Sequence, residues 1–141
     1  MRTTVKKRAN DMAEQPMKVL VVSDVHGRVT PLRWLLKNET ADALFFLGDG
    51  LYDLDQAIAA NGAAPDYPIY RVRGNCDIGF DDPAEGLAPF GGVLFFYTHG
   101  HLFGVKSGYE RIAEYAADRG ADVCCLATPT IKRCATVRRF P

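Results

Sequence analysis

Continuous hydrophobic runs alternate with amphipathic segments along most of this chain, and the alternation predicts an α/β fold. Four runs, rich in β-branched and aromatic residues, are typical of strands buried on both faces; they lie at residues 18–24, 43–49, 68–75 and 93–100. Gly91-Gly92 predicts a tight hairpin that leads into the last of these strands. A further strand is expected to begin at residues 121–126.

Amphipathic segments between the strands predict three helices, at residues 31–38, 51–60 and 109–120. Their ends carry residues that commonly cap helices: Thr30 followed by Pro31, Asn61-Gly62, Ser107 with Glu110 as a capping box, and Gly120. Strands and helices that alternate in this way predict one domain with a layered α/β architecture and a largely parallel sheet. We expect no internal repeat and no second domain.

The charges are unevenly distributed, although the 141-residue chain has 17 basic and 17 acidic residues. Residues 1–16 carry four basic and two acidic side chains, and residues 126–141 carry four basic and no acidic ones. The remaining nine basic and 15 acidic residues give residues 17–125 a net charge of −6, which suits a cation-binding domain. The basic C-terminal segment could suit nucleic acid, but no aromatic platform or groove-reading helix accompanies it.

The N-terminal segment does not read as a membrane or export signal. No hydrophobic run approaches the roughly 20 residues that span a bilayer, and residues 1–16 lack the apolar core of a secretory signal. We therefore expect a polar, disordered leader over residues 1–16, with Met17 as an alternative start, and a cytoplasmic protein without membrane contact. The four cysteines lack zinc-knuckle spacing and are expected to be reduced.

Polar residues with metal-binding chemistry follow four of the predicted strands. The segments are Asp24-Val25-His26-Gly27, Gly48-Asp49-Gly50, Gly74-Asn75-Cys76-Asp77 and Thr98-His99-Gly100-His101. Because ligands bind beyond the carboxyl ends of strands in open α/β sheets, we expect these four ends to face one cleft. Asp24 and His26 are two residues apart on an extended segment, which predicts that both side chains lie on one side. Carboxylate, imidazole and amide oxygen ligands suit Mn, Fe or Zn.

Each segment taken alone also has an ordinary structural interpretation. The first is consistent with a strand end and a turn, the second with Asp-Gly turn chemistry, and the third with an Asx turn. The fourth is harder to explain in this way, because a buried strand seldom ends in two histidines without a function. The agreement of four strand ends favours a metal site over four unrelated turns.

The segments SDVHG, LGDG, GNCD and THGH, in this order and at this spacing, resemble the motifs of the calcineurin-like metallophosphoesterases. The most similar branch is that of the compact bacterial and archaeal phosphodiesterases of YfcE type, and the resemblance extends from Met17 to about Asp122. It implies a layered β-sandwich flanked by helices that holds two divalent cations. It also implies hydrolysis of a phosphodiester or phosphomonoester by a water that both cations activate.

The resemblance further implies a set of metal ligands. Asp24 and His26 would bind the first metal, and Asp49 would bridge both metals. Asn75 and His99 would bind the second metal. Manganese is the expected cation, with Fe, Zn, Ni and Mg as alternatives.

The resemblance assigns the expected catalytic segment to Asn75, Cys76 and Asp77. Asp77 would lie behind the ligands and support them. Cys76 occupies the position at which many relatives have a histidine that protonates the leaving oxygen, and a thiol is a poorer proton donor there. His101 receives no ligand role.

The family pattern includes one more segment, Gly-His-Thr-His, where this chain has Leu126-Ala127-Thr128-Pro129-Thr130. Its two histidines would give one imidazole to each metal, so the resemblance implies that both metals lack a ligand. Permitted codons for Val123 to Thr130, read in a displaced frame, spell Val-Leu-Phe-Gly-His-Thr-His. We hypothesise a reading-frame slip near Val123. Residues 126–141 would then be an out-of-frame tail, and the domain of residues 17–125 would be truncated at its C-terminal end; a genuinely divergent tail is the alternative.

The expected function is therefore that of a metal-dependent phosphoesterase that is impaired in this chain. Its expected partner is a small-molecule phosphoester, and nucleic acid is expected only as a phosphodiester substrate. Nucleotides, cyclic nucleotides and sugar phosphates are all open as substrates, and the oligomeric state is not predicted. The alternative is a non-catalytic scaffold, because the same fold serves as a retromer subunit that binds proteins and has a degenerate metal site. The five intact ligand positions favour the enzyme.

Overall fold

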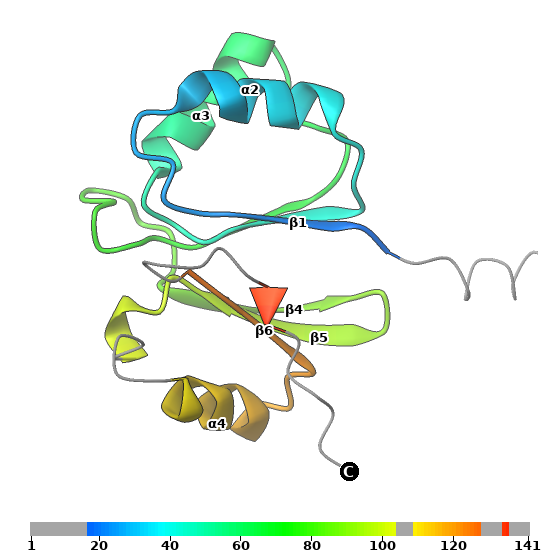
Figure 1. The fold of residues 1–141 in the computed structure, drawn as a ribbon, viewed down its shortest axis with the longest axis vertical. Coiled ribbons are helices and arrows are strands. Elements are labelled where there is room, and N and C mark those ends of the chain that lie inside the picture. Colours follow the sequence, from blue (N-terminus) through cyan, green and yellow to red (C-terminus); the bar gives the residue numbers. More distant parts are fainter. Residues whose placement is uncertain (1–16, 104–108, 128–133, 136–141) are drawn as a thin grey trace, which may run out of the picture.

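Two β-sheets form the centre of the protein, and helices cover the outer face of each (Figure 1). The structure is a computed structural model and describes residues 17–103, 109–127 and 134–135. The first sheet contains the parallel strands β1 (Val19–Val22), β2 (Ala43–Phe46) and β3 (Ile69–Arg71), in that order. Helices α2 (Val29–Asn38) and α3 (Leu51–Asn61) connect these strands and cover the outer face of this sheet, because parallel neighbours need a long crossover.

The second sheet has the order β4-β5-β6-β7 and mixed strand directions. Strands β4 (Glu85–Phe90) and β5 (Val93–Thr98) form the hairpin predicted from Gly91-Gly92. Strand β6 (Val123–Leu126) pairs with β5 in parallel, and the short β7 (Cys134–Ala135) pairs with β6 in antiparallel. A 3₁₀ turn, η1 (His101–Phe103), follows β5, and helix α4 (Glu110–Asp118) covers the outer face.

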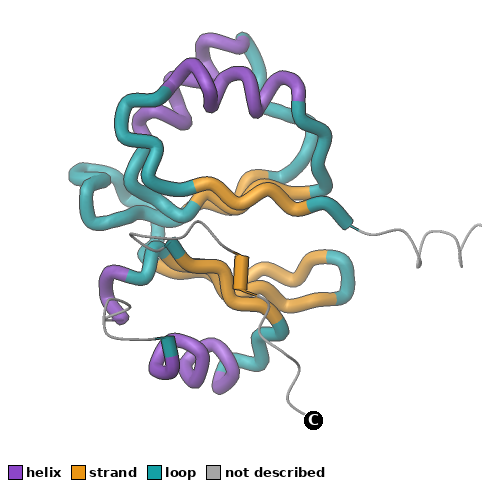
Figure 2. Tube along the Cα trace, in the orientation of Figure 1, coloured by secondary structure: helices purple, strands orange, loops and turns teal. Residues whose placement is uncertain are grey.

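The α/β fold class and the layered sandwich flanked by helices are confirmed, but the single largely parallel sheet is wrong. The strands divide into two stacked sheets, as Figure 2 shows in orange. The reason lies in β5, which is covered on one side by the first sheet and on the other by α4. Burial on both faces gives the same continuous hydrophobic run as a central parallel strand does.

Aromatic side chains fill the space between the two sheets. The ring of Phe45 lies 5.0 Å from Tyr70, 4.9 Å from Phe95 and 5.2 Å from Tyr97, measured between centroids. Its neighbours in β2, Leu44 and Phe46, pack on the opposite side against the helices. The alternation of side chains along a strand thus allows one buried strand to serve two cores.

Two predicted helix boundaries in the first half of the chain have different outcomes. Helix α3 ends as predicted, because Gly62 adopts the left-handed conformation (φ 81°) at its C-terminus. The predicted N-cap at Thr30 is wrong, since α2 begins at Val29. Pro31 still lies in the first helical turn, where backbone N–H groups have no partner within the helix.

The predicted capping box of the third helix is also wrong. The N-cap of α4 is Tyr109, and its side chain makes no capping hydrogen bond. Glu110 is the first helical residue, and Ser107 lies outside the described residues. Among the described residues, no helix is long and apolar enough to cross a membrane.

Candidate metal centre

The loops after β1 and β2 hold three residues in the left-handed backbone region. Asp24 (φ 54°), His26 (φ 42°) and Asp49 (φ 56°) are the non-glycine residues with positive φ in the described part of the chain. Such conformations cost on the order of 1–3 kcal/mol each and concentrate at functional sites. Hydrogen bonds from Asp24 N–H to Gly48 O and from Val25 N–H to Asp49 O, both 3.1 Å, keep the two loops side by side.

Asp24 and His26 do not lie on an extended segment, so that part of the prediction is wrong. Strand β1 ends at Val22, and the backbone turns at both residues. The turn nevertheless brings His26 Nε2 to 3.6 Å from Asp24 Oδ1. The imidazole is 59% exposed and the carboxylate 28%, so His26 lies on the outer side of this pair.

The side chains of Asp24, Asp49 and His99 form one group whose ligand atoms all lie within 4.8 Å of one another. His99 Nε2 lies 3.2 Å from Asp49 Oδ2, and both side chains are buried. The other ring nitrogen, Nδ1, lies 2.7 Å from the carbonyl oxygen of Leu47. Because a carbonyl only accepts, Nδ1 donates to Leu47, and Nε2 is the nitrogen that faces the carboxylate of Asp49. The end of β5 thus meets the end of β2.

The donor chemistry of this group fits a divalent cation. It contains two carboxylates, and among the described residues no lysine or arginine pairs with either of them. Placing like charges close together, one of them buried, is unfavourable unless a cation compensates them. Carboxylate oxygens and a neutral imidazole are ligands for Mn, Fe or Zn.

The loop after β3 lies against this group. The Cys76 N–H donates to Asp49 Oδ1 at 2.9 Å. Asn75 is exposed, and its Nδ2 lies 3.6 Å from Cys76 Sγ. The negative charge of Asp49, with some desolvation, raises the pKa of the exposed Cys76 thiol, which favours its protonated form. Asn75 therefore lies at the exposed edge of the group, and the residue that follows it contacts Asp49 directly.

Asp77 supports the group from behind. Its buried carboxylate accepts four backbone hydrogen bonds, from Asp49 (2.7 Å), Gly50 (2.9 Å), Leu51 (3.1 Å) and Gly74 (2.7 Å). Burial raises the pKa of Asp77, but these four donors outweigh it and hold the pKa below its ordinary value. The carboxylate therefore ties the loop after β3 to the start of α3 and fixes the backbone of Asp49.

Replacing Asp77 with asparagine is expected to lower the free energy of unfolding by about 3 kcal/mol, because bonds to a charged acceptor contribute roughly 1.5–3 kcal/mol each and the amide NH₂ cannot accept. Urea unfolding measures the change. Asp81→Asn is the matched control, since Asp81 is exposed in the same loop, and it should change stability by less than about 0.5 kcal/mol. Similar losses in both variants would contradict the role given to Asp77.

Two glycines permit this arrangement for a reason that sequence reasoning missed. A Cβ on Gly74 would overlap Asp49 Oδ1, and a Cβ on Gly48 would overlap the backbone of Gly74. These two glycines thus allow the loops after β2 and β3 to touch each other. The glycines that directly precede Asp49 and Asn75 were the signal in the sequence that could have indicated this contact between the loops.

The second histidine after β5 lies beside the group. The His101 ring centroid is 5.6 Å from that of His99. Desolvation and the neighbouring His99 lower the pKa of His101, which favours its neutral form. His101 is a further neutral imidazole beside the group, and no ligand role was predicted for it.

Comparison with known proteins identifies the family. Residues 17–126 match the model of the calcineurin-like phosphoesterase superfamily domain, which is well over half of the chain. The chain belongs to this superfamily. The resemblance stated from the four motifs is thereby confirmed.

Two relatives of this calcineurin-like phosphoesterase chain are bacterial. It is 33% identical over 110 residues to the probable metallophosphoesterase YsnB of Bacillus subtilis, covering 78% of this chain and 62% of YsnB. It is 31% identical over 112 residues to the phosphodiesterase YfcE of Escherichia coli K12, covering 64% of this chain and 61% of YfcE. The chain therefore spans less than two thirds of the length of either relative.

Solved structures share the calcineurin-like fold. A predicted phosphoesterase from Streptococcus pneumoniae matches with a TM-score of 0.61 and 22% identity, over 84% of this chain and 79% of that one. Chaetomium thermophilum Vps29 matches with a TM-score of 0.61 and 17% identity, over 79% and 62%. A structure of Entamoeba histolytica Vps29 complexed with Zn²⁺ matches with a TM-score of 0.56 and 20% identity, over 78% and 63%. At these identities the likeness shows the fold alone.

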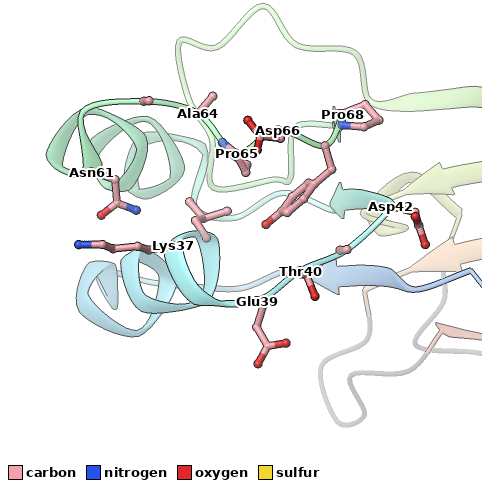
Figure 3. A pocket seen from close by; sticks show the side chains of 13 residues that line it. Lys37, Glu39, Thr40, Asp42, Asn61, Ala64, Pro65, Asp66 and Pro68 are labelled. Carbon is pink, nitrogen blue, oxygen red and sulfur yellow. The ribbon is translucent and has the colours of Figure 1, made fainter.

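A cavity of about 600 Å³ lies at the opposite edge of the first sheet (Figure 3). It is lined by residues that precede β2 and β3, whereas the candidate metal ligands follow the strands. Lys37, Glu39 and Asn61 are among the polar residues there, and the Tyr67 hydroxyl is buried without a hydrogen-bond partner among the described residues. The cavity contains none of the predicted site residues.

Proposed function

We propose that this chain is the catalytic unit of a metal-dependent phosphoesterase that hydrolyses small phosphodiesters or phosphomonoesters. The observation that carries the proposal is the group of Asp24, Asp49 and His99, with ligand atoms within 4.8 Å of one another. Membership of the superfamily and the names of the bacterial relatives support it. We further propose that His26 and Asn75 complete a centre for two cations, manganese first, in a cytoplasmic protein.

The residues of the chain have distinct proposed roles. Divalent cations held by these residues would supply Lewis-acid activation of water and would stabilise charge on phosphate oxygens. His99 presents Nε2 because Leu47 holds its other nitrogen, and Asp77 fixes the backbone that carries Asp49. Cys76 holds a thiol proton at the rim and is the proposed donor to the leaving oxygen.

We propose that the centre is incomplete in this chain. Strands β5 and β6 pair in parallel with Thr98 opposite Leu126, so Ala127 continues this register beside His99. Ala127 is buried, and a histidine at this position would reach the group. The Gly-His-Thr-His segment implied by the family pattern belongs here, although Thr128 to Thr130 lie outside the described residues. The reading-frame slip near Val123 remains our proposed cause.

The proposal predicts Mn²⁺ binding that is weak but specific, with slow hydrolysis of an aryl phosphodiester that a chelator abolishes. Electron paramagnetic resonance follows the loss of the free Mn²⁺ signal, and release of the aryl alcohol follows turnover. His99→Ala should abolish both the Mn²⁺ binding and the hydrolysis, while its circular dichroism spectrum stays like that of the wild type. Turnover that is the same with and without chelator would contradict a metal-dependent reaction.

The second candidate function is a non-catalytic scaffold, which the fold likeness to Vps29 and the absent histidine segment favour. Two of the three residues with strained backbone, Asp24 and Asp49, belong to the potential metal site, which favours the hydrolase. Thermal unfolding distinguishes the two, because a ligand that binds the folded state raises the melting temperature by mass action. A scaffold without a metal site predicts the same melting temperature with and without Mn²⁺.

A further inference from the structure

Two arginines flank Val72 at the carboxyl end of β3, and their surroundings differ. Arg71 is 27% exposed and forms ion pairs of 2.7 Å with both Asp55 and Asp82. Arg73 is exposed and makes no ion pair with any described residue; its Nη1 donates to the carbonyl oxygen of Asp82 at 3.3 Å. Among the described residues, both ion pairs of this cluster go to Arg71, and Arg73 forms none.

Arg73 borders the metal-ligand group. It precedes Gly74, where an added Cβ would overlap Asp49 Oδ1, and its own carbonyl carbon would lie 2.8 Å from a Cβ added to Gly48. Its backbone N–H donates to Pro83 O at 2.9 Å, which fixes the start of the loop. Arg73 therefore lies at the start of the loop that contacts Asp49.

The chemistry of Arg73 suits a phosphate. A guanidinium is weakly hydrated and has five N–H donors in a planar fork that matches phosphate oxygens. One donor is used by the Asp82 carbonyl, which orients the group and leaves the others for a ligand. Residues 17–125 carry a net charge of −6, so an exposed cationic side chain at this edge favours the approach of an anionic substrate.

We propose that Arg73 is a substrate-binding residue that holds a non-bridging oxygen of the phosphoester beside Asp24, Asp49 and His99. This inference rests on the proposed function for the identity of the ligand. It assigns the anion-binding half of the site to the loop after β3, and it distinguishes Arg73 from Arg71, whose charge is committed to holding the fold.

Phosphate binding tests the proposal, with inorganic phosphate as the probe and ³¹P NMR or calorimetry as the readout. Arg73→Gln is expected to weaken phosphate binding to the Mn²⁺-treated chain by about tenfold or more, because it removes a charged hydrogen-bond donor. Arg73→Lys should recover part of the affinity through charge alone. The Mn²⁺ affinity should be unchanged in both variants. A purely structural role of Arg73 predicts instead that the affinities for Mn²⁺ and for phosphate fall together.

Two further arginines serve as controls. Arg111 is exposed on α4 in the other half of the protein, and Arg111→Gln should bind phosphate like the wild type. Arg28 is exposed on the loop after β1. Its replacement by glutamine tests whether the loss of any cationic side chain near the group weakens phosphate binding. Equal phosphate affinity in Arg73→Gln and the wild type, or a loss caused by Arg28→Gln alone, overturns the proposal.

The outcomes separate this inference from the proposed function. If the wild type takes up no Mn²⁺, the proposed function fails, and the same comparison of Arg73→Gln with the wild type is made on the metal-free chain. A tenfold difference there supports anion binding by Arg73 on its own. No phosphate binding by the wild type, with or without Mn²⁺, overturns the inference.

Discussion

Replacing Asp49 with asparagine is expected to lower the Mn²⁺ affinity of the chain by at least about 100-fold. Replacing a residue that only supports a metal ligand typically lowers the metal affinity by roughly 10–100-fold, and Asp49 is proposed to contact the cation itself. Its carboxylate is buried and lies 3.2 Å from the Nε2 of His99. Asparagine removes the negative charge while it keeps an oxygen that can accept from the Cys76 N–H.

Titration with Mn²⁺, followed by electron paramagnetic resonance, measures this loss, and urea unfolding checks that the fold remains. Asp66→Asn is the matched control, because Asp66 is exposed and lines the cavity at the opposite edge of the sheet. The control should bind Mn²⁺ like the wild type. Equal affinities in Asp49→Asn and Asp66→Asn would place the cation elsewhere on this acidic protein.

Restoring an imidazole beside His99 is expected to have the opposite effect. Ala127→His should strengthen Mn²⁺ binding by about tenfold or more, because Ala127 continues the β5–β6 register at the metal edge. The triple variant Leu126→Gly, Ala127→His, Pro129→His recreates Gly-His-Thr-His in place and should raise the chelator-sensitive hydrolysis of an aryl phosphodiester further.

The control for this gain is Ala63→His, which adds an imidazole at an exposed position beside the opposite cavity. Because Ala127 is buried, thermal unfolding must show that Ala127→His remains folded at the assay temperature. A folded variant without increased Mn²⁺ affinity would contradict the proposed place of the missing ligand. The codons for residues 118–141 test the proposed origin of the missing ligand separately. If these codons do not encode Gly-His-Thr-His in the displaced frame, the chain has a divergent tail.

The elements of the fold could be predicted from the sequence, but the division of the strands into two sheets could not. Strand β2 illustrates why, because Phe45 faces the other sheet while Leu44 and Phe46 face helices. A run that is hydrophobic at every position records burial on both faces, and it does not record what covers each face. Only the resemblance to a known family supplied the sandwich.

The site shows a similar division between what the chain encodes locally and what packing decides. Asp24, Asp49 and His99 could be predicted because each ends a buried strand, where a polar residue stands out. The strained backbone of Asp24, His26 and Asp49 could not be predicted, since it depends on hydrogen bonds between loops. The same holds for the Leu47 carbonyl that orients His99 and for the four donors to Asp77.

The most direct test of the metal centre is anomalous X-ray scattering at the manganese edge from crystals grown with Mn²⁺. We expect two manganese peaks that share Asp49 as a ligand, one of them within coordination distance of Asp24 and the other within coordination distance of His99 Nε2. These three donors come from three strand ends that are far apart in the chain, so peaks beside all three would establish one common centre. Crystals saturated with Mn²⁺ that show no peak among them would contradict it.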